Sequence, residues 1–129
     1  MSFETALRTR LKGASPVAAI VAARIDWTVR PERSAYPAVV LQLVADGRPQ
    51  HMKGLQTYRP TRVQIDCFAE SAAQKAALRE AVIAAILPEA EVSGRSFRRA
   101  TINTVRDLSA NSETGFVHRD SIDALFWHD

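Results

Sequence analysis

Hydrophobic residues recur at helical spacing near the start of the chain. We expect a helix that Ser2 opens and Gly13 ends, because the apolar residues between them fall on one face. Those residues are Phe3, Ala6, Leu7 and Leu11. A short second helix should follow, with Ser15 as its N-cap, Pro16 as its first residue, and a buried side. That buried side comprises Val17, Ile20 and Val21.

A third helix is predicted after Ser71. Ser71 and Gln74 have the spacing of a capping box, and Pro88 should end the helix. Between them runs one apolar stripe made of Leu78, Ala81, Val82, Ala85 and Ile86.

Five segments have the patterns of β-strands, namely residues 25–29, 36–45, 62–69, 97–108 and 117–127. Residues 36–45 are apolar on both faces except at Gln42, so we expect both faces to be covered. Residues 62–69 alternate, as in a half-buried strand. In 97–108, the residues Ala100, Ile102 and Thr104 should share one side.

The element order is therefore α-α-β-β-β-α-β-β. Most connections between strands lack a crossover helix, so an α+β fold is expected, with a mixed, mostly antiparallel sheet of about five strands. The helices should pack on one face of that sheet. Residues 1–129 are expected to form a single domain.

The long connection after residue 45, DGRPQHMKGLQTYRP, has no clean periodicity. From Gly47 to Arg62 it carries several basic residues and no acid. They are Arg48, His51, Lys53, Arg59 and Arg62, with Tyr58 as the one aromatic residue. Two interpretations stay open: a contact arm for an acidic partner or for passing DNA, and a solvated loop.

Two further segments are candidates for contact surfaces. Arg95, Arg98 and Arg99 form a second basic cluster, which is typical of both edge protection and protein interfaces. At the end of the last strand both faces are apolar. One face can go to the core, and we favour a subunit contact for the other, Leu125 and Trp127, over burial under a loop.

Composition argues against a strong nucleic-acid binder, a disulfide-rich protein, and a secreted or membrane-spanning protein. The net charge of +3 is mild, and a single cysteine, Cys67, permits no internal disulfide. The start lacks the apolar region of a signal peptide, and no run approaches the length of a membrane span. We therefore expect a protein made and assembled in the cytoplasm, with no membrane partner.

The sequence contains no recognisable catalytic or metal-binding motif. Glycine-rich phosphate loops and metal-binding spacings of histidine are absent, so we expect no enzyme, cofactor or metal. His118 and Asp120 share a strand face and could form a metal or acid–base pair, but a solvated pair is favoured. Cys67 is expected to be buried and structural. Asp66 and Glu70 could be paired carboxylates, but we expect them to balance Arg62 and neighbouring arginines across strands.

Four segments together resemble the tail-completion, or tail-terminator, proteins of long-tailed phages, which also occur in prophages and gene transfer agents. They are SFETALRTRLKG…VAAIVAARIDW, YPAVVLQLV, RVQIDCFAES with its alanine-rich helix, and the closing strand ending in FWH. The resemblance spans nearly the whole chain. Its most specific part is RVQIDCFA followed by the capped helix.

The resemblance implies a homohexameric ring on the head-proximal end of the tail tube, without catalytic residues. Such a ring stops tube polymerisation at the length set by the tape-measure protein, and then joins the head–tail connector or stopper. DNA passes through its lumen. A place at the neck of a virion or phage-like particle follows.

Three other functions remain as alternatives. The first is another neck component, such as a head–tail adaptor or stopper, which also forms rings. The second is a small nucleic-acid-binding or ligand-binding module that uses residues 47–62. The third is an enzyme that uses His118 and Asp120.

Overall fold

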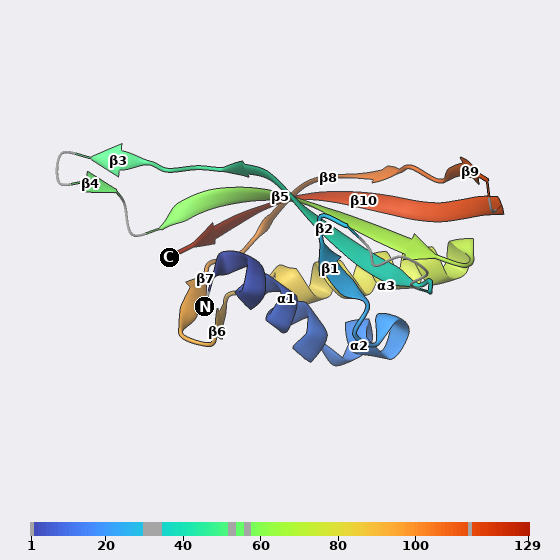
Figure 1. The fold of residues 1–129 in the computed structure, drawn as a ribbon. Coiled ribbons are helices and arrows are strands. Elements are labelled where there is room, and N and C mark those ends of the chain that lie inside the picture. Colours follow the sequence, from blue (N-terminus) through green and yellow to red (C-terminus); the bar gives the residue numbers. More distant parts are fainter. Residues whose placement is uncertain (1, 30–34, 52–53, 56–57, 114) are drawn as a thin grey trace.

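The helices form a layer against one face of a mixed, mostly antiparallel sheet (Figure 1). This arrangement is seen in a computed structural model that describes residues 2–29, 35–51, 54–55, 58–113 and 115–129. The α+β fold class with helices on one face is thereby confirmed. Within the described residues, no helix has both the length and the apolar character needed to cross a membrane.

The three helices are α1 (Phe3–Gly13), α2 (Ser15–Val21) and α3 (Ala72–Ile86). Ser2 and Ser71 cap α1 and α3 as predicted, because their hydroxyls accept from the backbone N–H three residues on. The prediction for Ser15 is wrong. Ala14 is the N-cap of α2, without a side-chain hydrogen bond, and Ser15 is already helical.

The large sheet has the order β1-β2-β5-β10-β7-β6, and two more strands, β8 and β9, also pair with β10. Only β1 and β2 are parallel among the pairs described. The strands are β1 (Ile25–Trp27), β2 (Ala38–Asp46), β5 (Arg59–Ala69), β6 (Ala90–Val92), β7 (Arg95–Phe97), β8 (Thr101–Asp107), β9 (Ala110–Ser112) and β10 (Gly115–His128). A separate pair, β3 (Gln50–His51) and β4 (Gly54–Leu55), lies between β2 and β5.

The core lies between the helices and the sheet. Phe3 at the start of α1 packs against Phe97 of β7 and Phe126 of β10, with ring centroids 5.9 and 5.8 Å apart. The apolar stripe of α3 is buried at Leu78, Val82 and Ile86. Burial of these side chains is the main term that stabilises the domain.

The expectation that residues 36–45 are covered on both faces holds for only half of β2. The first four residues of the strand, Ala38 to Leu41, are buried. Beyond them Leu43 and Val44 are 42 and 50% exposed.

Residues 97–108 are not one continuous strand. Phe97 belongs to β7, and β8 begins only at Thr101. A bulge at Asn103 places Ile102 opposite Ala124 and Thr104 opposite Asp123. Ile102 and Thr104 therefore lie on opposite faces, which corrects the prediction that they share one.

Candidate functional surfaces

No reactive centre forms at the residues that the sequence offered for chemistry. Cys67 is fully buried, and burial raises the pKa of its thiol far above the ordinary value. A thiol so placed is not a nucleophile at neutral pH. Among the described residues, no group of three or more His, Cys, Asp and Glu side chains is placed to hold a metal ion.

The predicted pair of His118 and Asp120 is not a solvated pair. Asp120 is only 1% exposed and accepts a hydrogen bond of 2.9 Å from Nη1 of Arg79. Lys75 Nζ lies 3.5 Å from its other oxygen. The ring of His118 instead packs edge-on against Phe116, 4.9 Å between centroids. Asp120 thus attaches α3 to the sheet.

The carboxylates on the opposite face of the sheet also have structural partners. Asp66 pairs with Arg119 of β10 at 2.9 Å, so its partner is an arginine on a neighbouring strand, as expected, but it is not Arg62. Arg62 forms a bidentate pair with Asp123, and this pairing lowers the pKa of Asp123. Glu70 is exposed, and its backbone N–H donates to the side chain of Gln74.

The long basic connection is an extension of the β2–β5 hairpin that projects beyond the helical layer (Figure 1). β5 begins at Arg59, three residues before the expected start, and β3 pairs with β4 farther out. His51 lies in β3, whereas Lys53 lies outside the described residues.

Asp46 neutralises the arginines at the base of this extension. Its carboxylate lies 2.6 Å from Nη2 of Arg48 and 3.2 Å from Nε of Arg59, and it accepts a hydrogen bond of 3.0 Å from Thr61. Burial opposes ionisation of Asp46, but these partners outweigh it and its pKa is lowered. Asp46 lies one residue before the segment Gly47–Arg62, which contains basic residues and no acid.

A buried contact continues from Thr61 into the last strand. Thr61 Oγ1 lies 2.6 Å from Nε2 of His128, whose ring is fully buried and stacks on Phe3 at 4.1 Å. Burial lowers the pKa of His128, which favours the neutral ring. This role is not visible in the sequence, because a single histidine at the end of a strand shows no pattern of its own.

The second basic cluster, residues 95–99, contacts both the basic connection after β2 and the end of the last strand. The guanidinium of Arg98 lies 4.7 Å from the ring centroid of Tyr58, and the Tyr58 hydroxyl is hydrogen-bonded to Ser96 at 3.1 Å. The backbone N–H of Arg98 donates to the carbonyl of Trp127. Arg99 is exposed. Three segments distant in sequence therefore converge at one end of the sheet.

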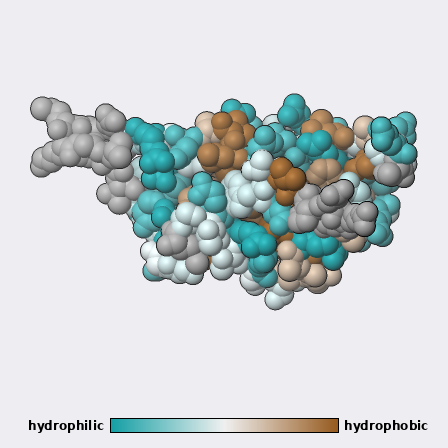
Figure 2. All heavy atoms as spheres, in the orientation of Figure 1, coloured by the Kyte–Doolittle hydropathy of each residue, from teal (hydrophilic) through white to brown (hydrophobic). Residues whose placement is uncertain are grey.

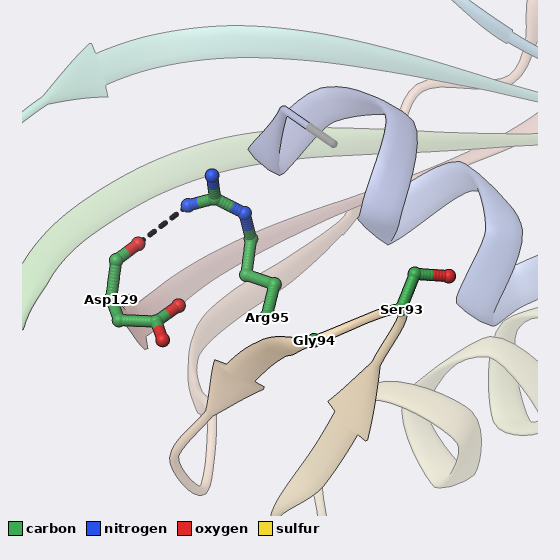
Figure 3. A pocket seen from close by; sticks show the side chains of 4 residues that line it. All are labelled: Ser93, Gly94, Arg95 and Asp129. Atoms are coloured by element: carbon green, nitrogen blue, oxygen red, sulfur yellow. Dashed lines mark hydrogen bonds between the residues drawn. The ribbon is translucent and has the colours of Figure 1, made fainter.

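A shallow pocket of about 240 Å³ lies at the same end, lined by Ser93, Gly94, Arg95 and Asp129 (Figure 3). Arg95 Nη1 donates to the main-chain oxygen of Asp129 at 2.5 Å. The Ser93 hydroxyl points away from both residues (Figure 3). Arg95 therefore holds Asp129 in place. The pocket does not bring a basic group next to the Ser93 hydroxyl, so it lacks the arrangement of an activated nucleophile.

The last strand divides its two faces as expected. Phe126 and His128 are fully buried on the helix side, whereas Trp127 is 38% exposed and Leu125 half-buried on the other side. Hydrophobic side chains gather in separate patches among hydrophilic ones, and do not form one continuous apolar surface, on the face shown in Figure 2. Scattered apolar side chains of this kind are ordinary on protein surfaces, so this face by itself marks no single contact site.

Comparisons with known proteins concern the fold and the family. A solved chain described as "Virion of native gene transfer agent (GTA) particle" superimposes with a TM-score of 0.70 at 15% identity, covering 99% of this chain and 96% of that one. A second solved chain gives a TM-score of 0.63 at 12% identity, with 98% and 92% covered. At such identities these likenesses show the fold alone.

No curated protein matches the sequence significantly. A family model does match. Residues 5–124 fit the model described as "Tail completion protein gp17", and the chain therefore belongs to this tail completion family.

Proposed function

We propose that this protein forms a ring, a homohexamer, on the head-proximal end of a tail tube. The ring ends polymerisation of the tube and provides the joint to the head connector or stopper. Membership of the tail completion family supports a structural role in the tail, and the fold shared with a chain of a gene transfer agent virion is consistent with it. The work is then geometric and not enzymatic.

One observation carries the proposal beyond the family. The basic extension, the arginines of residues 95–99 and the exposed side of the last strand converge at one end of the molecule, through Tyr58, Arg98 and Trp127. A closed ring needs two different patches on each subunit, so that each contacts the next by rotation. In this proposal the arginines of residues 95–99 and the exposed side of the last strand supply one such patch, and the extension projects from it toward other partners.

The partners of such a ring are further copies of the chain, the tail tube protein, the head–tail connector or stopper, and the tape-measure protein. DNA would pass through the lumen without being read. Most arginines near the extension have carboxylate partners, as Arg48 and Arg59 have in Asp46. A strong nucleic-acid binder would instead present a continuous unpaired basic stripe.

Native mass spectrometry and light scattering of the purified protein test the ring directly. We expect a hexamer, alone or on the ends of isolated tubes seen by electron microscopy. Only monomer at high concentration, with no ring on tails, would overturn the proposal. Deleting the gene should give overlong or unjoined tails, whereas heads that leak DNA from tails of normal length would point to a stopper.

Single substitutions test the interface. Trp127→Asp and Leu125→Asp should each abolish the ring while the far-UV circular dichroism is retained, since both side chains lie on the sheet face away from the core. An unpaired buried carboxylate at a subunit contact is strongly unfavourable. Phe116→Asp is the matched control. It removes a 55% exposed aromatic from the other end of the same strand. Unchanged assembly of the Trp127 and Leu125 variants would exclude this interface.

A further inference from the structure

Among the described strands, two open edges of the large sheet lie on opposite sides of the β5–β10 pair. On one side β1 pairs only with Val39–Leu41 of β2. The N–H of Val39 and the carbonyl of Leu41 face that side, where they bond to Arg24 and Thr28. By strand alternation the backbone of Leu43 faces the same way, and none of the described strands pairs with it there.

The other open edge is β8. It pairs with β10 from Asp120 to Leu125, and among the described residues no strand pairs with its outer side. Six of its seven residues are exposed, Ile102 being the exception. Val105 is exposed although it faces the helix side, opposite the buried Ile122. Exposed apolar side chains thus lie on both open edges, at Leu43, Val44 and Val105.

The directions of the strands make these two edges complementary. β2 is antiparallel to β5, β5 to β10, and β10 to β8. Across these four strands the outer two run in opposite directions. Rotation about an axis along the strands keeps each direction, so β2 of one copy meets β8 of the next as an antiparallel pair.

We propose that neighbouring subunits join by continuing the sheet, the Gln42–Asp46 edge of one copy pairing with β8 of the next. The occupant of each edge is a second copy of this chain, because one head-to-tail contact closes both edges at once. A two-fold contact would pair like with like, β8 with β8, and leave the β2 edge open. This inference rests on the proposed ring and gives its contact a defined chemistry.

Such a junction has a consequence for the wall of the ring. The helices stay on one side of the continuous sheet. The other side carries polar residues in rows across the strands, such as Gln42, Gln64 and Asp123. Backbone hydrogen bonds would supply much of the affinity, and the side chains along the two edges would set the register.

Cysteine cross-linking tests the pairing and its register. Gln42 and Thr104 are exposed and lie on the polar face, as do Thr101 and Arg106 of β8. We would combine Gln42→Cys with Thr101→Cys, Thr104→Cys or Arg106→Cys in one chain and oxidise the protein at a concentration at which native mass shows the ring. Gln42→Cys with Val105→Cys is the control, because Val105 lies on the opposite face. The native Cys67 is fully buried.

One of the three pairs should give a reducible ladder of oligomers on denaturing gels, up to the full ring. The control pair and each single cysteine should give little or none. A hexameric mass without a ladder from any pair would overturn the sheet continuation and leave the ring standing. Dimers from Thr104→Cys alone would favour the two-fold contact instead. A monomeric mass at every concentration would overturn the ring, and this inference with it.

Discussion

Asp120 of β10 forms ion pairs with Lys75 and Arg79, two basic residues of α3. Its carboxylate is buried. Removing the buried partner of an ion pair is costly, whereas a solvent-exposed pair contributes little. Lys75 and Arg79 each keep a second carboxylate, Asp107 and Glu80, at 2.9 and 3.1 Å.

We therefore expect Asp120→Asn to lower the free energy of unfolding by about 2–4 kcal/mol, because both cations lose a buried carboxylate but keep a second partner. Urea denaturation followed by circular dichroism measures this change. Asp123→Asn is the matched control on the same strand. Its partner Arg62 has a half-exposed side chain, and a loss of about 0–1 kcal/mol is expected. Equal losses in the two variants would contradict a special role for Asp120.

The sequence indicated that Asp120 shares a face with His118 but not which face was buried. Strand alternation decides only which residues share a face. The position of α3, which covers one face, decides that Asp120 meets Lys75 and Arg79. Cys67 was predictable as buried because it shares a strand face with Val63 and Ile65, and that face is clearly apolar.

At the scale of elements, helix capping separates α3 from α2. The hydroxyl of Ser71 accepts from the N–H of Gln74 at 3.1 Å, whereas Ser15 lies inside the first turn of α2 and caps nothing. A lost N-cap costs about 1 kcal/mol. Ser71→Ala should therefore lower the free energy of unfolding by about that amount, and Ser15→Ala should leave it nearly unchanged. Thermal and urea denaturation of the two variants measures both changes. If Ser15→Ala lowered the free energy of unfolding as much as Ser71→Ala, the assignment of Ser71 as the N-cap that matters would be refuted.

The longer elements were predictable from sequence and the short ones were not. Residues 62–69 and 72–86 carry several turns or alternations of pattern, so their type was clear. β6 and β7 have three residues each around the turn at Ser93 and Gly94, whose φ angles are 50° and 84°. The Ser-Gly pair was the only local signal of that hairpin. β3 and β4, with two residues each, offer no period at all.

The β-bulges at Val44 in β2 and Asn103 in β8 were also not predictable from the sequence. Each inserts one residue opposite a regular strand and shifts every later side chain to the other face. Local sequence does not mark such an insertion, because the pairing partner determines it. The candidate contact residues were found individually from their types, whereas their convergence depends on the long β5–β10 register.

At the scale of the whole molecule, the hairpin extension and the ring contact are separable. The extension is anchored at its base by pairing of Asp46 with Thr61 and by a hydrogen bond from the N–H of Gly47 to the carbonyl of Pro60, 2.8 Å long. These contacts lie closer to the body than β3 and β4. The open edges of the sheet lie in β2 and β8, also outside the tip. A shortened hairpin should therefore keep the fold and the ring.

We predict that replacing residues 49–57 by Asn-Gly, a pair that favours tight hairpin turns, leaves the melting temperature and the native mass unchanged. The joining of tails to heads should fall strongly, because the ring then lacks its projecting contact arm. Complementation of a deletion strain, scored by infectious or gene-transferring particles, measures the loss. Replacing Ser93-Gly94 by Asn-Gly is the control, since it changes another hairpin turn while keeping its length. Full complementation by the shortened protein would show that the extension is a solvated loop, and a monomeric mass would show that it belongs to the subunit contact.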